Sequence, residues 1–161
     1  MVDLDPRIGN CCLDANALDA AGTADGAEVD ELLRQYWESD DFRLQVPCSV
    51  RQEIKHPHTP AGVKRNMSPF IYSEDVELTD DESARRDRIR GILQGNSKPG
   101  RHHQDADHLF WSQRYGGRHF ITHDRRLLKK AEEIFEALTI KVLQPGDFLE
   151  ALEPHRKRRS W

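Results

Sequence analysis

Apolar positions along this chain alternate between short continuous runs and longer stretches with helical spacing. Short runs that end at polar or acidic residues predict strands at 8–13, 44–46, 119–122 and 139–143. Stretches with apolar residues three or four positions apart predict helices at 27–38, 49–56, 79–95, 104–115, 125–137 and 146–152. Strands that alternate with helices in this way predict an α/β fold, a three-layer α/β/α sandwich with a mainly parallel central sheet.

Two parts of this pattern depend on local signals. Ser49 is the expected N-cap of its helix, with the acceptor for a capping box at 52–53. Residues 57–78 are predicted to form a loop because two prolines and Gly62 oppose regular structure there. Within that loop, 70–72 is expected to be packed or strand-like, and 76–78 to form an edge strand or an extended segment. Trp37 and Trp111 fall on the apolar faces of their helices and are expected in the core.

The length and charge of the chain predict its domain organisation and suggest possible partners. A chain of 161 residues with no domain-scale linker predicts one domain over 1–153, followed by a basic tail at 154–161. The net charge of -4 is unevenly distributed, because residues 1–41 hold 11 acids and 2 bases and the remainder is therefore positive. Basic clusters at 85–90, 125–130 and 156–159 could follow a phosphate backbone, or could be solvated helix faces and a loose tail.

Other compositional signals are weaker. No stretch approaches the roughly 18 apolar residues that span a bilayer, and the acidic N-terminus does not resemble a signal peptide. The three cysteines form neither a zinc signature nor a disulfide framework, so they are expected to be buried thiols. We therefore expect a cytoplasmic protein that does not contact a membrane.

Acidic residues follow the predicted strands. Asp14 comes directly after the first strand, Asp124 lies two residues after Thr122, Glu53 lies in the helix after the second strand, and Asp105 begins the helix 104–115. Because the carboxyl ends of parallel strands meet at one edge of a sheet, we expect these carboxylates to converge. Crowded carboxylates repel one another, and oxygen ligands suit Mg²⁺ or Mn²⁺. The sequence therefore predicts a metal site that acts on phosphate.

Several neighbouring residues are added candidates. Asp107 lies about 200° around its helix from Asp105, and a shift of the helix start by one turn would exchange the two as metal ligand. His108 shares a helical face with Asp105 and could contact phosphate or simply be packed. Arg125 and Arg126 could guide a nucleic-acid backbone or belong to a surface helix, and Thr122 could hold Asp124 by a hydrogen bond.

The order of these acids resembles the active-site pattern of PIN domains, over roughly residues 8–145. The segments that carry the resemblance are Leu13-Asp14-Ala15-Asn16-Ala17-Leu18, the helix start containing Glu53, Asp105-Ala106-Asp107-His108-Leu109, and the Thr-x-Asp segment Thr122-His123-Asp124. The resemblance implies a Rossmann-like fold and a nuclease dependent on Mg²⁺ or Mn²⁺, with Asp14, Glu53, Asp105 and Asp124 as the catalytic acids. Two departures are the extra length in 57–100 and a histidine at position 123.

The resemblance also implies a biological role. Many small PIN proteins are endoribonuclease toxins of toxin–antitoxin pairs (the VapC type), often homodimers silenced by a small antitoxin protein. By this resemblance the chain would hydrolyse RNA to a 5′-phosphate and a 3′-hydroxyl. Asp14, Asp105 and Asp124 would hold the metal, and Glu53 would complete the cluster or orient the attacking water.

Three alternatives stay open at this level. The chain could be a non-catalytic PIN-like module that binds RNA or a protein partner. A phosphatase acting on small phosphoesters is less well supported, because Asp14 is not followed by the Asp-x-Asp-x-Thr pattern of the best-known α/β type. A zinc site is a third alternative, formed by His56, His58, His102 and His103.

Overall fold

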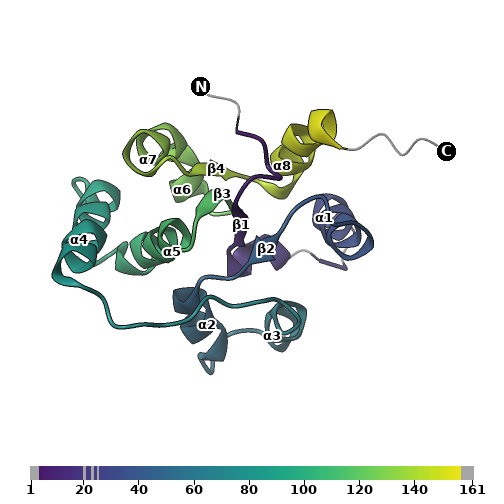
Figure 1. Cartoon of the computed structure of the whole chain (residues 1–161). Helices are drawn as coiled ribbons and strands as arrows, with labels where there is room; N and C mark the ends of the chain where they lie inside the picture. The colour runs from purple at the N-terminus through teal and green to yellow at the C-terminus, as the bar shows by residue number, and fades with distance from the viewer. Residues whose placement is uncertain (1–3, 20, 23, 25, 157–161) are drawn as a thin grey trace.

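The structure, a computed structural model, describes residues 4–19, 21, 22, 24 and 26–156. Within these residues, four short strands form one sheet in the order β2-β1-β3-β4 (Figure 1). All three neighbouring pairs are parallel, which confirms the predicted sheet type. The strands are β1 (Asn10–Leu13), β2 (Leu44–Gln45), β3 (Gly117–Ile121) and β4 (Lys141–Leu143).

β1 begins two residues later than predicted. Ile8 was expected in the strand, but its side chain is 63% exposed, and Gly9 has a φ of +82°. A strand cannot include that left-handed conformation, which favours glycine. A Cβ atom on Gly9 would also lie 2.8 Å from the carbonyl oxygen of Gly116. The turn that leads into β1 therefore requires glycine.

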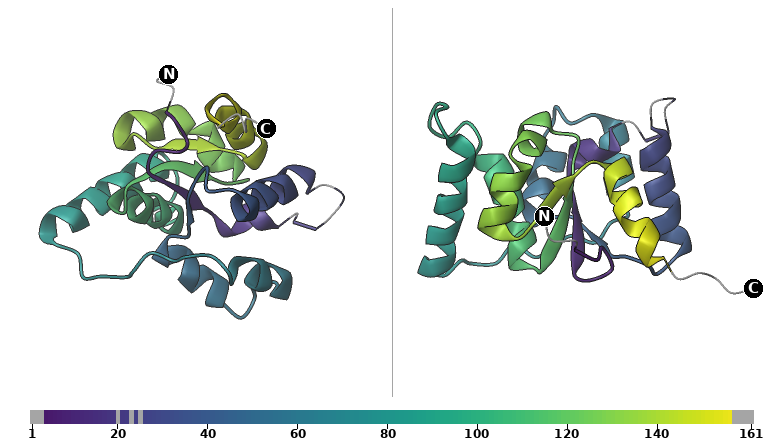
Figure 2. Two further views of the ribbon diagram at one scale, coloured as in Figure 1. Left: turned by 45° about the vertical axis from the view of Figure 1, so that its right-hand side comes forward. Right: turned by 90° about the horizontal axis from the view of Figure 1, so that it is seen from above.

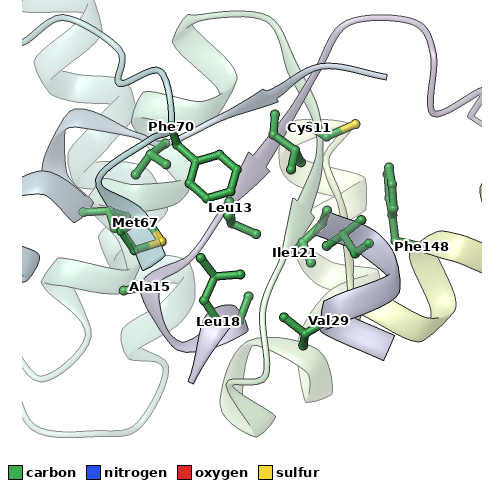
Figure 3. Close-up of a cluster of buried hydrophobic side chains, with 14 of the residues drawn as sticks. Cys11, Leu13, Ala15, Leu18, Val29, Met67, Phe70, Ile121 and Phe148 are labelled. Atoms are coloured by element: carbon green, nitrogen blue, oxygen red, sulfur yellow. The ribbon is translucent and has the colours of Figure 1, made fainter. Parts of the chain in front are cut away.

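One face of the sheet carries a hydrophobic cluster that includes Cys11, Leu13 and Ile121 (Figure 3). Because successive side chains of a strand point to opposite faces, Cys12 belongs to the cluster on the other face. The helices that cover the first face contribute Val29, Met67 and Phe148 to the cluster. They are α1 (Ala27–Glu38), α3 (Ala61–Met67) and α8 (Pro145–Leu152).

The other face of the sheet packs Cys12, Phe120 and Val142 against a second set of helices. Figures 1 and 2 show this set on the opposite side of the sheet from α1 and α8. Helices on both faces make the molecule a three-layer α/β/α sandwich, as predicted. The second set consists of α4 (Asp80–Gln94), α5 (His103–Arg114), α6 (Arg125–Lys129) and α7 (Ala131–Leu138).

The segment 57–78 contains a helix, α3, where the sequence predicted a loop. Pro60 precedes α3 with a φ of -55°, and Val63 and Met67, one turn apart, are buried in the first cluster. Two buried residues and Gly62 give too weak a helical pattern to be recognised, so tertiary packing stabilises this short helix. Val46 forms an isolated parallel bridge with Tyr72, so 70–72 is in part strand-like, but 76–78 is not a strand.

Other predictions of local structure have mixed outcomes. The helix predicted from residue 79 is present as α4, and Thr79 forms a capping box with Glu82 at its start. Ser49 is not a cap, because α2 (Cys48–Lys55) begins one residue earlier, after Pro47. The predicted helix 125–137 is interrupted at Lys130, and Trp37 is 58% exposed rather than buried. Trp111 is buried, as expected.

The last strand begins at Lys141 rather than at 139, because Thr139 ends α7 in the left-handed conformation with a φ of 56°. We expect Thr139→Gly to raise the free energy of unfolding by about 0.5–1 kcal/mol, since glycine adopts this conformation without strain. Urea unfolding of the two proteins measures the difference. A Thr139→Ala control should show no gain, and a glycine variant less stable than the parent would contradict the expectation.

Two further elements complete the described chain, the short 3₁₀ helices η1 (Ala15–Leu18) and η2 (Glu153–His155). The predicted basic tail falls mostly on residues 157–161, which lie outside the described residues. No helix in the described ranges is both long and apolar enough to cross a membrane.

The strand order determines where a ligand site can form. After β1 the chain continues to β2, which lies on the side of β1 away from β3. After β3 it continues to β4, which lies on the side of β3 away from β1. Connections that diverge from two adjacent strands open a crevice at their carboxyl ends, which is where α/β proteins bind ligands. Asp14 and Thr122 are the residues that follow β1 and β3 at this crevice.

Candidate metal centre

Asp14 directly follows β1, at the point where the connections from β1 and β3 diverge. Its backbone N–H donates to the carbonyl oxygen of Ile121 at 3.0 Å, so the sheet pairing continues one residue beyond β1. The backbone N–H of Thr122 likewise donates to Leu143 at 3.0 Å. This register places the Asp14 and Thr122 side chains next to each other, and Asp14 is only 5% exposed.

Thr122 joins the ends of the two strands. Its hydroxyl donates to Asp14 Oδ2 at 2.8 Å and accepts from the backbone N–H of Asp124 at 3.0 Å. Asn16 extends this network, since its Oδ1 accepts from the backbone N–H of His123 at 3.0 Å and lies 3.0 Å from the Thr122 hydroxyl. The predicted hydrogen bond between Thr122 and Asp124 is therefore present, with the backbone N–H of Asp124 as the donor, and the threonine also orients Asp14.

Glu53 reaches the same site from α2, through His108 of α5. His108 Nε2 lies 3.0 Å from Glu53 Oε2, and His108 Nδ1 lies 2.7 Å from the hydroxyl of Ser49. One ligand atom from each of Asp14, Glu53 and His108 lies within 4.8 Å of the others. Within the part of the chain that the structure describes, these three side chains form the group of His, Cys, Asp or Glu residues that lie close enough together to hold a metal ion.

Asp105 and Asp124 lie beside this group, and both form ion pairs with the guanidinium of Arg126. Arg126 Nη2 is 2.9 Å from Asp124 Oδ2 and 3.4 Å from Asp105 Oδ2. Asp124 also accepts from the backbone N–H of Arg126, which makes it the N-cap of α6. On its other side, Asp105 lies 3.7 Å from His102 Nδ1. Arg126, which we predicted to bind substrate, therefore neutralises the two acids in this structure.

Asp107 lies apart from these acids. Arg90 of α4 forms two parallel hydrogen bonds to its carboxylate, each 2.8 Å long. This paired geometry is the strongest that arginine and a carboxylate make, and it occupies both oxygens of Asp107. Of the two candidates on α5, Asp105 is the one whose charge acts on Asp14.

Burial and crowding shift the pKa values of the site. Burial raises the pKa of Asp14 to about 6, and the charges of Glu53 and Asp105 contribute to this rise. Burial also raises the pKa of Asp105, with a further contribution from Asp124. Partial burial alone would raise the pKa of Asp124, but its hydrogen bonds with Arg126 hold it below the ordinary value. The cluster as a whole therefore favours the binding of a cation.

The surroundings of His108 favour the protonated form of its imidazole. Burial alone would lower its pKa, but the hydrogen bond to Glu53 and the negative charges of Asp14 and Asp105 together raise it above the ordinary value. A protonated imidazole at this place faces the carboxylates that a divalent cation would otherwise neutralise. The donor atoms and the negative charge of the site thus fit Mg²⁺ or Mn²⁺.

An open cleft of about 1020 Å³ leads to Glu53 and Ser49 from the outside. It lies among η1, α2, α3 and the start of α5, and its lining combines polar side chains with apolar surface. The polar side chains that line it are Asn16, Asp19, Ser49, Gln52, Glu53, His56, His58, Thr59, Arg65, Asn66, Gln104 and Asp107. The cleft is large enough for one or more nucleotides.

The zinc alternative is not supported. The rings of His56 and His58 lie 5.2 Å apart and line the cleft, but His102 instead approaches Asp105. Within the described residues, the four histidines do not form a group with metal-ligand spacing. His58 donates its backbone N–H to His56 Nδ1, which is a local turn contact.

Sequence reasoning missed the partners that define this geometry. Ser49 pairs with a residue 59 positions away, Arg90 with one 17 away, and Asn16 with the segment after β3, more than 100 away. The only local signal was the position of His108, one turn from Asp105 on the same face of α5. The other contacts depend on how α2, α4 and α5 pack.

No protein-family model matches this chain, and a search of the curated proteins also finds no match.

Proposed function

We propose that this protein is a metal-dependent endoribonuclease that hydrolyses single-stranded RNA. The observation that carries the proposal is the buried carboxylate of Asp14 at the divergence of β1 and β3, with ligand atoms of Glu53 and His108 within 4.8 Å. A buried acid with a raised pKa among other acids destabilises the fold. Proteins keep such groups mainly at functional sites.

The side chains have separate roles in this proposal. Asp14 and Glu53 would hold Mg²⁺ or Mn²⁺, with Asp105 and Asp124 completing the negative site, and this ion would supply Lewis-acid stabilisation of the phosphate. Thr122 keeps Asp14 aligned by its hydrogen bond of 2.8 Å. Glu53, whose side chain is 40% exposed and lines the cleft, would also orient the attacking water. Attack on phosphorus would leave a 5′-phosphate and a 3′-hydroxyl.

The cleft favours RNA over a small phosphoester. Its lining offers amide and imidazole groups from α2, α3 and the turn between them, together with the exposed Arg65. Such groups hydrogen-bond to the edges of unpaired bases. Arg125 is exposed beside Asp124 and could contact a backbone phosphate, and Arg126 could turn to the same phosphate once a metal neutralises its acids.

Removal of metal tests this proposal. We expect cleavage of a labelled single-stranded RNA in the presence of Mn²⁺ or Mg²⁺, complete loss with EDTA, and recovery when excess Mn²⁺ is added. Product ends should carry a 5′-phosphate, which a phosphate-dependent exonuclease detects. Cleavage that persists undiminished in EDTA, or that leaves a cyclic phosphate, would refute the proposal.

A second candidate is a non-catalytic module of the same fold that binds RNA or a protein. It is favoured by the internal cation of the site, because Arg126 already neutralises part of the charge of Asp105 and Asp124. Calorimetric titration with Mn²⁺ separates the two candidates. No binding at millimolar Mn²⁺ favours the module, whereas micromolar binding favours the nuclease.

The resemblance noted in the sequence extends the proposal to a toxin of a toxin–antitoxin pair, acting in the cytoplasm as a homodimer. A small DNA-binding protein encoded next to this chain, able to bind it and block cleavage, would support that role.

A further inference from the structure

The imidazole of His108 is held firmly within the acid cluster. Its side chain is only 2% exposed, and both ring nitrogens have partners. Nδ1 faces the hydroxyl of Ser49 at 2.7 Å, and Nε2 faces Glu53 Oε2 at 3.0 Å. The ring therefore has one orientation, with Nε2 directed at the carboxylate of Glu53.

The positions of these atoms match those of adjacent metal ligands. Two ligand atoms at right angles around an octahedral ion, each about 2.1 Å from it, lie about 3 Å apart. The separation between His108 Nε2 and Glu53 Oε2 is 3.0 Å, and one ligand atom from each of Asp14, Glu53 and His108 lies within 4.8 Å of the other two. The tautomer with its proton on Nδ1 presents the Nε2 lone pair in this direction, so a metal can bind there without rotation of the ring.

Ser49 provides the support that a metal-bound imidazole needs. A histidine that binds metal through Nε2 usually donates its Nδ1–H to a fixed acceptor, which sets the tautomer and the orientation of the ring. The Ser49 hydroxyl occupies that place and lies one turn before Glu53 on α2. One helix thus positions both a ligand and the partner of a second ligand.

We propose that His108 is a nitrogen ligand of the metal and that it makes this centre select Mn²⁺ over Mg²⁺. Imidazole binds transition-metal ions well, whereas Mg²⁺ strongly prefers oxygen. This inference rests on the metal site of the proposed function. It differs from the set of four acids that the sequence suggested, since it replaces a uniform oxygen site with a mixed nitrogen and oxygen site.

Electron spin-echo envelope modulation of bound Mn²⁺ tests the inference directly, because it detects nitrogen bound to the metal. We expect ¹⁴N modulation in the wild-type protein and its replacement by ¹⁵N features after labelling with [¹⁵N]histidine. His108→Gln should remove the modulation. The matched control is His155→Gln, a histidine on η2 that pairs with Asp5 before β1, at the other end of the sheet.

Calorimetric titration with Mn²⁺ and with Mg²⁺ measures the selectivity of the site. We expect His108→Gln to weaken Mn²⁺ binding by about tenfold or more but Mg²⁺ binding by less than about threefold. Ser49→Ala keeps the buried His108 ring but removes the partner of its Nδ1, so it should also weaken Mn²⁺ binding more than Mg²⁺ binding. This variant replaces His108→Gln in the test if the glutamine variant does not fold.

The outcomes separate this inference from the proposed function. Mn²⁺ that binds wild-type protein without ¹⁴N modulation, or equally well with His108 replaced, would overturn the role of His108 and leave the metal site intact. Absence of binding by either metal at millimolar concentration would overturn both proposals. Modulation that persists in His108→Gln would assign the nitrogen to another histidine and would also overturn the inference.

Discussion

Asp14→Asn is expected to lower RNA cleavage by about a thousandfold or more while it stabilises the metal-free protein at neutral pH. Asparagine has the same shape and can still accept the hydrogen bond from Thr122, but it brings no charge into the site. The loss of charge removes a metal ligand and also removes the cost of burying an ionised carboxylate among other acids. Activity and stability should therefore change in opposite directions.

The pH dependence of this effect follows from the pKa of Asp14. The folded value is about 6, above the ordinary value of 3.8, so between these two pH values the folded protein holds more protons than the unfolded chain. The contribution of Asp14 to the free energy of unfolding of the metal-free wild type should then fall as pH rises from about 4 to 6. Above that window the loss is complete, on the order of 2–3 kcal/mol.

Thermal or urea unfolding in EDTA at pH 4.5 and pH 7.5 measures this prediction. We expect Asp14→Asn to be clearly more stable than wild type at pH 7.5 and the difference to shrink at pH 4.5. Asp40→Asn, at an exposed position before β2, should show neither change. A variant that is less stable than wild type at pH 7.5 would show that the charged Asp14 stabilises the metal-free fold, contrary to our account.

Thr122→Val is expected to cost about 2–3 kcal/mol of stability, because it leaves two buried polar groups without their partner. The threonine is fully buried, and its hydroxyl donates to Asp14 Oδ2 and accepts from the N–H of Asp124. Valine keeps the shape but offers no hydrogen bond. Since Thr122 also lowers the pKa of Asp14, its loss should weaken metal binding as well.

A double-mutant cycle identifies the source of this cost. Thr122→Ser keeps the hydroxyl and should lose about 1 kcal/mol or less, while Thr122→Val measured in the Asp14→Asn background should cost less than in the wild type. Urea unfolding of the four proteins of the cycle gives the coupling energy. A coupling energy near zero would mean that the hydroxyl acts only through Asp124 or through packing.

The overall fold could be predicted from local pattern. Runs such as Cys11–Leu13 and Phe120–Ile121 are apolar on both faces because helices cover the sheet on both sides, and this pattern identifies a parallel strand. α1 was predicted at its observed bounds because its apolar stripe is long and regular. The short helix α3 was missed because its stability comes from contacts with η1 and α2 rather than from its own residues.

The candidate site was predictable only in outline. Acids that follow strands must lie near one edge of a parallel sheet, so Asp14 and Asp124 could be placed there without coordinates. The choice between Asp105 and Asp107 could not be made in this way, since it depends on Arg90 of another helix. The pairing of Arg126 with both Asp105 and Asp124 likewise requires α5 and α6 to meet.

The hydrophobic periodicity and the order of the acids thus specify the layers of this protein and the edge at which its chemistry is expected, because both are local properties of the chain. The packing of α2, α4 and α5 around that edge specifies which carboxylates remain in the cluster and adds Ser49 and His108 to it. Hydrogen bonds and ion pairs form over about 3 Å, whereas their partners here are separated by as many as 108 residues of sequence. Such contacts exist only once the helices are in place.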